Sequence, residues 1–246
     1  MDAFVPYGGL HAVALAVCLP AIACARAHWP SAGTTSGDHP APHAGDARCL
    51  LLACLHDVVD WHGLDSRTGL PLQVCDFNGL IAPLALLSGW RFVRAALYFW
   101  TAALTLQAFI QPALTAGPAA LVFWAFWMAH TLIAACAVYD LVVLGYRPCW
   151  NDLGRALIVS ACYVALVVPI NLWLGSNYGY LGHPAAVSEI PPFVYALGPW
   201  PERAIILVAL VPLGFVAALL PWLILGRRRR LEPPSIRNSE RAIGSI

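Results

Sequence analysis

Long apolar stretches separated by short polar ones dominate the pattern of the chain. A helix needs about 20 mainly apolar residues to cross the hydrocarbon core of a bilayer. Apolar runs that approach or exceed this length occupy residues 10–25, 49–61, 72–88, 95–111, 119–144, 153–174 and 204–225. We therefore predict an all-α polytopic membrane protein with seven transmembrane helices.

Two of these runs also admit other interpretations. The run 10–25 ends in small residues, as a signal peptide does, but no basic residue precedes it, so we favour an uncleaved helix. The run 49–61 is short and polar at its end, and we expect it to cross as a thin or tilted helix. Residues from about 29 to 47 are rich in Pro, Gly, Ser and Thr, which predicts a flexible loop.

Composition supports the membrane assignment. The chain is 60% hydrophobic and only 11% charged, against about 25% charged residues in a soluble domain. Its basic cluster, Arg227 to Arg230, directly follows the last apolar run. That position suits an anchor at an anionic membrane surface, so we expect lipid and not nucleic acid as a partner. We predict one transmembrane domain at residues 1–226 and a basic, disordered cytoplasmic tail at residues 227–246.

The positions of the arginines predict the direction of insertion. All fourteen basic residues are arginines, and only Arg67 and Arg203 fall on the side of the membrane that also holds the N-terminus. The other arginines lie in the alternate loops and the C-terminal tail. Because cytoplasmic loops carry the excess of basic residues, the N-terminus is expected outside and the C-terminus in the cytoplasm.

The sequence gives little indication of a metal site or of disulfide bonds. The eight cysteines are scattered, with no Cys-x-x-Cys pair and no ligand-like spacing to histidine. A candidate metal site would combine His56, Asp57, Asp60 and His62. Of these, His56 and Asp60 share a helical face, but the other two do not lie cleanly on it, so we favour interfacial polarity. We expect neither a metal nor a cofactor.

Two reactive side chains lie inside apolar runs. Cys75 and Asp76 occupy the first turns of the run 72–88, and His130 lies within the run 119–144. Ionisable groups are costly near hydrocarbon and often mark functional sites. If Trp124 marks the membrane interface, Cys75 and His130 lie at a similar depth below the outer surface. Asp76 points away from Cys75 around the helix, and we expect it to cap the helix or to pair with another helix.

A cysteine beside a histidine is typical of nucleophilic catalysis. Cys75 would attack an acyl group as the thiolate, and His130 would take its proton and later activate the acceptor. Further polar residues are predicted near the same end, where they would bind substrate or donate to an oxyanion: Gln107, Gln111, Asn171, Asn177 and Tyr178. The alternative is that Cys75 fills space and that the polar groups form a structural hydrogen-bond network between helices.

An ordered series of motifs resembles the YwaF-like family of bacterial integral membrane proteins. The resemblance extends from His11 to about Trp222. Its motifs are Leu70 to Asp76, Tyr98-Phe99-Trp100, Leu106-Gln107-Ala108, Gln111-Pro112, Ala129-His130, Arg147-Pro148, Asn171 with Asn177-Tyr178, and Gly198-Pro199-Trp200-Pro201. The chain departs from the family at Gln73, where members typically have histidine, and at Thr131, where they usually have glycine.

The resemblance carries expectations about function. The bacterial family is similar to a eukaryotic multispanning acyltransferase that moves polyunsaturated acyl chains onto ether phospholipids, and more distantly to the androgen-induced membrane hydrolases. In the acyltransferase a cysteine and a histidine are the proposed catalytic pair, and Cys75 and His130 match their order and approximate separation. The resemblance therefore implies acyl transfer or acyl-ester hydrolysis on membrane lipids, by a multi-pass protein of the bacterial inner membrane.

A second hypothesis is a small-solute transporter, or a non-catalytic membrane protein with a structural polar cluster. A polar path that continues to the cytoplasmic face would favour the transporter. A lateral opening between helices would favour the lipid enzyme. The sequence predicts neither the lipid nor the oligomeric state.

Overall fold

The computed structural model describes residues 8–27, 70–183 and 190–231. Within these ranges every regular element is helical and no strand is present. The elements are α1 (Gly9–Ala27), α3 (Val74–Ser88), α4 (Arg91–Trp100), the π-helix η1 (Thr101–Thr105), α5 (Gln107–Ile110), α6 (Leu121–Val142), α7 (Trp150–Leu174), the 3-10 helix η2 (Tyr178–Tyr180), α8 (Pro192–Tyr195) and α9 (Glu202–Leu231). The prediction of an all-α chain is confirmed for the described residues.

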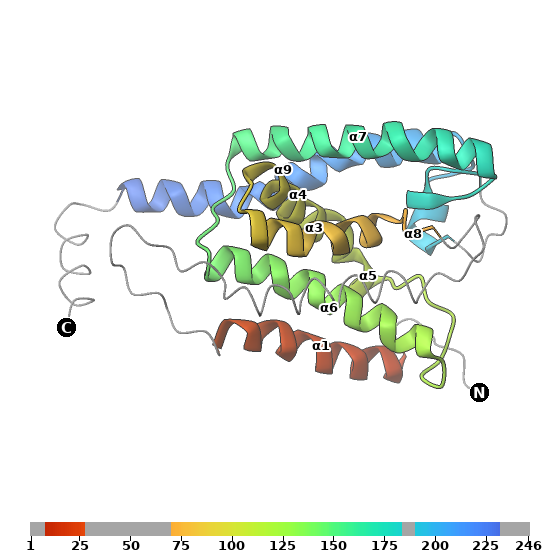
Figure 1. Cartoon of the computed structure of the whole chain (residues 1–246), viewed down its shortest axis with the longest axis horizontal. Helices are drawn as coiled ribbons and strands as arrows, with labels where there is room; N and C mark the ends of the chain where they lie inside the picture. The colour runs from red at the N-terminus through yellow and green to blue at the C-terminus, as the bar shows by residue number, and fades with distance from the viewer. Residues whose placement is uncertain (1–7, 28–69, 184–189, 232–246) are drawn as a thin grey trace.

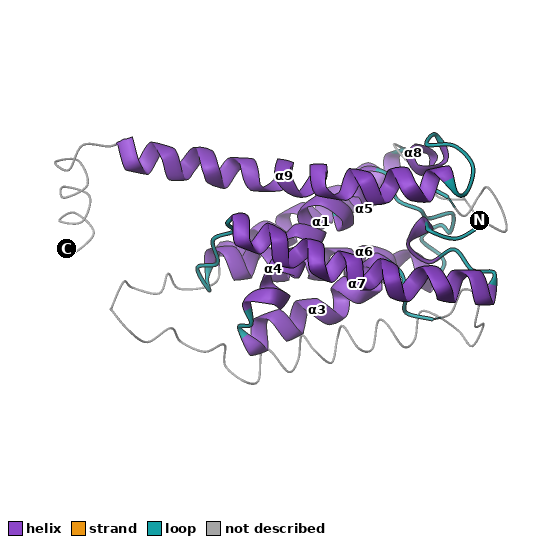
Figure 2. Ribbon diagram, turned by 90° about the horizontal axis from the view of Figure 1, so that it is seen from above, coloured by secondary structure: helices purple, strands orange, loops and turns teal. Residues whose placement is uncertain are grey.

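The long helices form a bundle that is elongated along their axes (Figures 1 and 2). The helical stretches that are long and apolar enough to cross a membrane are Arg91–Ile110, Leu121–Val142, Trp150–Leu174 and Glu202–Leu225. Two shorter apolar helices accompany them, His11–Pro20 and Val74–Ser88. The chain is therefore a multi-pass membrane protein by the length and composition of its helices.

Part of the predicted topology lies outside the described residues. The run 49–61, the loop at about 29–47 and the polar residues His56, Asp57, Asp60 and His62 all fall between residue 27 and residue 70. The count of seven spans and the direction of insertion therefore stay predictions.

Two helices have bounds that hydropathy did not predict. The helix expected over 95–111 begins at Arg91 and has a π-helix, Thr101–Thr105, in its middle. The last helix continues beyond residue 225 to Leu231, through the arginine cluster. Hydropathy ends a span at the first arginines. A helix can continue there because its backbone hydrogen bonds are internal to the helix and do not require apolar side chains.

One end of the bundle, which we call the arginine end, holds the starts of α4 and α7 and the end of α6. Asp152 accepts hydrogen bonds from Arg91 at 2.7 Å and from Arg155 at 2.6 Å. Asp140 pairs with Arg94 at 2.8 Å. These ion pairs join α4, α6 and α7. The opposite end, which we call the loop end, holds the starts of α3, α6 and α9, the end of α7, and the turns η2 and α8 (Figure 1).

Aromatic side chains fill the core around α4. Phe99 and Phe215 are fully buried and their ring centroids lie 5.3 Å apart, which joins α4 to α9. The Trp100 indole N–H donates to the Ser160 hydroxyl at 2.9 Å, which joins α4 to α7. Many large apolar side chains point outward instead, as Trp173 does with 83% of its surface exposed. An apolar outer surface is expected for helices that face lipid.

Candidate functional site

A capping box begins α3 and places Cys75 in its first turn. The Gln73 N–H donates to the Asp76 carboxylate at 3.0 Å, and the Gln73 side chain accepts from the backbone of the third helical residue. The four N–H groups at a helix start lack partners in the helix, so this arrangement stabilises the turn. The prediction that Asp76 caps the helix is confirmed.

The turn before α3 is also held from the other side of the bundle. The Gly179 N–H donates to the Gln73 side-chain oxygen at 2.9 Å, and the Tyr163 hydroxyl donates to the Leu72 carbonyl at 2.7 Å. The Leu70 N–H donates to the Tyr178 hydroxyl at 3.0 Å. Three bonds from α7 and η2 therefore fix the backbone that carries Cys75.

A buried polar contact joins α3 to the π-helix. The Asn78 side-chain amide donates to the hydroxyls of Thr101 and Thr105 at 3.0 and 2.9 Å. All three residues are buried, and Asn78 is fully so. A π-helix is rare and is frequently found at functional sites. Here it turns two hydroxyls toward α3 and leaves its remaining residues to face other helices.

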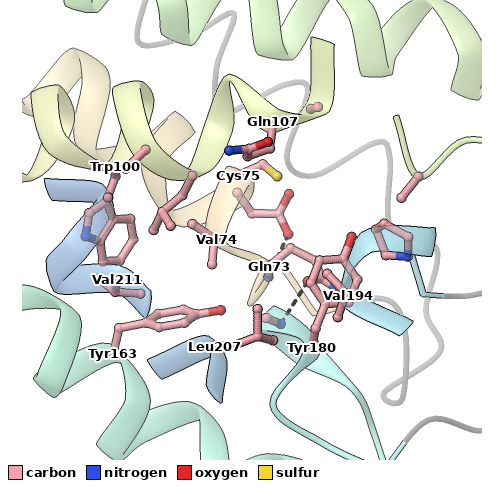
Figure 3. Close-up of a pocket in the computed structure, with 18 of the residues that line it drawn as sticks. Gln73, Val74, Cys75, Trp100, Gln107, Tyr163, Tyr180, Val194, Leu207 and Val211 are labelled. Carbon is pink, nitrogen blue, oxygen red and sulfur yellow. Dashed lines mark hydrogen bonds between the residues drawn. The ribbon is translucent and has the colours of Figure 1, made fainter. Parts of the chain in front are cut away.

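A cavity of about 620 Å³ lies among α3, η1, α6, α7, α9 and the turns of the loop end. Figure 3 shows Gln73, Val74, Cys75, Gln107 and Tyr180 around it. Four of the residues predicted from sequence line this cavity, namely Cys75, His130, Gln107 and Gln111. Most of the other lining residues are apolar. A concave, mainly apolar space with a few polar groups is typical of a small-molecule or lipid site.

Cys75 is a free thiol that is partly exposed at this cavity. Among the cysteines that the structure describes, it alone lines the cavity. Cys18 and Cys136 are buried elsewhere, whereas Cys149 and Cys162 lie on α7 or at its start. Cys75 therefore differs from the other described cysteines in its contact with the cavity.

His130 has a defined tautomer. Its Nδ1 lies 2.7 Å from the Phe126 carbonyl oxygen, and since a carbonyl only accepts, Nδ1 carries the hydrogen. In the neutral ring the lone pair is then on Nε2. That atom is buried and has no hydrogen-bond partner. No hydrogen bond joins His130 to Cys75 in this conformation, so the two residues share a cavity without direct contact through Nε2.

Asn171, Asn177 and Tyr178, also predicted from sequence, lie beside the cavity and do not line it. The Asn171 amide bonds to both backbone groups of Tyr178, and the Asn177 oxygen accepts from the Gly182 N–H at 3.1 Å. These residues hold the turn that follows α7. Their part in binding substrate stays a prediction.

The structure adds polar residues that sequence reasoning missed. Tyr163 and Tyr180 line the cavity, and Arg203 is 2% exposed, with its guanidinium donating to the carbonyls of Tyr180 and Gly182. Burial raises the pKa of the Tyr180 hydroxyl, which therefore stays protonated as a donor. Tyr163 lies in an apolar run and Tyr180 just beyond its end, and aromatic residues are common at membrane interfaces, so the sequence pattern gave no separate signal for either tyrosine.

No group of three or more His, Cys, Asp or Glu side chains is placed to hold a metal ion in the part of the chain that the structure describes. The four residues considered from sequence for such a site, among them His56 and Asp60, lie outside that part.

Comparison with known proteins identifies a family that matches most of the chain. The sequence model of the TMEM164 family matches residues 49–224, which include every cavity-lining residue. No curated protein matches the chain. No solved structure matches it either.

Proposed function

The chain belongs to the TMEM164 family of multispanning membrane proteins, and from this premise we propose an enzyme that transfers or hydrolyses the acyl chains of membrane lipids. Cys75 is the nucleophile and His130 the general base. One observation carries the proposal: a thiol and an imidazole whose buried Nε2 has no hydrogen-bond partner, from helices far apart in the chain, line one largely apolar cavity. The likeness of the motifs to a eukaryotic Cys/His acyltransferase points the same way.

The proposed reaction has two balanced steps. His130 Nε2 accepts the thiol proton, Cys75 Sγ adds to the ester carbonyl of the donor lipid, and the C–O bond breaks. The leaving alcohol takes the proton back from His130, and the acyl group remains on Cys75 as a thioester. An acceptor hydroxyl then gives its proton to His130 and attacks the thioester, which restores the thiol. With water as the acceptor, the same steps give hydrolysis.

Donors for the oxyanion are available in the cavity. Gln107 lines it, and Gln111 does so with its side-chain oxygen already accepting from the Phe193 N–H at 3.2 Å, which leaves its amide hydrogens to donate. The Tyr180 hydroxyl is a third donor. Donors placed where charge develops are worth about 10²–10³ in rate each. Catalytic hydrogen bonds often form fully only once the substrate is bound, so the lack of a Cys75–His130 bond in the free protein fits this role.

Access to the cavity supports a lipid substrate. Val208 and Leu210 of α9 both line the cavity and expose 40% and 44% of their surface, on a helix whose outer side is apolar. A lipid can therefore enter beside α9 from the bilayer. At the arginine end, no described residue of the ion-pair network lines the cavity. One-sided access favours a lipid enzyme over a transporter, which needs a path through the membrane.

The test is the formation of a thioester on the purified protein. We would incubate it with phosphatidylcholine that carries an alkyne-tagged acyl chain and measure hydroxylamine-sensitive tag on the protein. We expect Cys75→Ala to abolish labelling and His130→Ala to slow it by about 10²–10⁴-fold, the usual contribution of a general base. Cys136→Ala is the matched control, because Cys136 is 2% exposed and lies outside the cavity.

The fold of each variant would be checked by its thermal unfolding in detergent. If folded Cys75→Ala labels as wild type does, the nucleophile is wrong. If only His130→Ala labels normally, the thiol acts without this histidine and the assignment of the base is wrong.

A further inference from the structure

One side of the cavity is an apolar arm between η1, α7 and α9. We call it the α9 arm and define it by its lining residues Trp100, Ala103, Ser160, Val164, Val211 and Gly214. Figure 3 shows Trp100, Val211 and Tyr163 on one side, apart from Gln107 and Cys75. The groups proposed for the chemistry, Cys75, Gln107 and His130, belong to α3, α5 and α6, whereas the hydroxyl of Ser160 in the arm is already bonded to the Trp100 indole. The cavity therefore has a polar part, where chemistry would occur, and an apolar part.

The inner end of the α9 arm is closed by close packing. A Cβ atom at Gly214 would lie 3.2 Å from the Ala103 Cβ, which is tighter than ordinary van der Waals contact. Beside this pair, the Trp100 indole bonds to Ser160 at 2.9 Å. Behind it, Phe99 and Phe215 are both fully buried. Gly214 is also the cavity-lining residue of α9 nearest the arginine end, so the arm ends at this glycine.

The π-helix determines which residue faces Gly214. Thr101 and Thr105 are held toward α3 by Asn78, at 3.0 and 2.9 Å. This contact fixes the rotation of η1, so that Ala103 lies between them on the side that faces the cavity and α9. Two small residues thus meet at the end of the arm, and either one could be enlarged without touching Cys75 or His130.

We propose that the α9 arm holds the hydrocarbon tail of a single acyl chain and that Gly214, opposed by Ala103, sets the longest chain that the cavity accepts. The identity of the reacting carbonyl rests on the proposed function, whereas binding of the chain does not. Each methylene buried in an apolar site tightens binding about fourfold. A tail that reaches Gly214 gains no more from further methylenes, because there is no space beyond this residue.

The test measures binding without catalysis. Native mass spectrometry of the protein in detergent would give its relative affinity for octanoate, laurate, palmitate and stearate. We expect wild-type affinity to rise with chain length up to a limit. In Gly214→Leu the rise should stop at a shorter chain, while octanoate binds as it does to wild type. Leu213→Phe is the matched control, because Leu213 lies next to Gly214 on α9, is 65% exposed and does not line the cavity.

Binding of octanoate serves as the fold control in the same experiment. If Gly214→Leu loses octanoate too, Ala103→Val, which enlarges the opposite side by less, carries the test with the same expected shift. A length profile like that of wild type in a variant that still binds octanoate overturns the proposal.

The two proposals fail in different ways. A length shift without thioester on Cys75 supports the α9 arm and contradicts the enzyme. Thioester formation whose chain-length preference does not depend on residue 214 supports the enzyme and contradicts the arm.

Discussion

The Asn171 side-chain amide bonds through both its oxygen and its nitrogen to the turn that follows α7. Its oxygen accepts from the Tyr178 N–H at 2.8 Å and from the Ser176 hydroxyl at 2.9 Å, and its nitrogen donates to the Tyr178 carbonyl at 2.9 Å. The side chain is 2% exposed. The same turn also binds Gln73, because the Gly179 N–H donates to the Gln73 side-chain oxygen. Asn171 therefore supports the backbone of Cys75 from a distance.

We expect Asn171→Ala to lower stability. The substitution leaves buried backbone groups without partners, which costs about 1–3 kcal/mol for each such group. Thermal unfolding in detergent measures the effect. Asn177→Ala should cost less, because Asn177 contributes one bond, to the Gly182 N–H. If Asn171→Ala unfolds as wild type does but loses acyl labelling, Asn171 acts on the substrate directly and not through the turn.

The meeting of α4 and α7 at the arginine end depends on one carboxylate. Asp152 is fully buried and accepts from Arg91, from Arg155 and from the Cys149 N–H. It caps α7 and pairs with α4 at the same time. Tyr146 covers the neighbouring guanidinium groups, with its ring 5.4 Å from Arg91 and 4.9 Å from Arg94. At this end, charge thus joins the starts of the two helices, and the Tyr146 ring packs on the arginines of α4.

Asp152→Asn should separate these starts. The change removes the charge that balances Arg91 and Arg155, and losing one partner of a buried pair costs about 3–5 kcal/mol. We expect about 3 kcal/mol, the lower end, because Arg91 is 49% exposed and stays hydrated. Chemical unfolding in mixed micelles would measure the loss. Glu202→Gln, an exposed carboxylate in the first turn of α9, is the control and should change stability little.

The molecule as a whole has two different ends. Arg91, Arg94, Arg147 and Arg155 gather at one of them, and α9 extends past that end toward the C-terminus (Figure 1). The cavity lies toward the other end. From this arrangement the positive-inside rule predicts that the arginine end lies in the cytoplasm and the cavity on the outer side.

Reporter fusions expressed in a bacterium test this orientation. Alkaline phosphatase, active only outside the cytoplasm, should be inactive when fused after Ile246 and active when fused after Leu197, between α8 and α9. A fluorescent protein that folds only in the cytoplasm should give the opposite pattern. Phosphatase activity at the C-terminus would reverse the topology and turn the cavity toward the cytoplasmic leaflet.

The sequence by itself determined that this is a helical membrane protein and where most of its described helices lie. A helix in lipid must form its backbone hydrogen bonds within its own segment. Its position can therefore be predicted from a local run of apolar residues. The Asp76 cap is equally local, because its partner is three residues away. Counting residues from the expected membrane interface also predicted a similar depth for Cys75 and His130. In the structure both line one cavity, and their catalytic role stays a prediction.

Only the tertiary structure decided what surrounds those residues. The threonines of the π-helix bond to Asn78 of another helix, Asn171 bonds to a turn, and the α9 arm ends where Ala103 and Gly214 meet across a helix pair. None of these depends on neighbours in sequence. Hydropathy predicts which segments lie in lipid. A cavity is the space that packed helices leave between them, and its shape depends on side chains that meet only after folding.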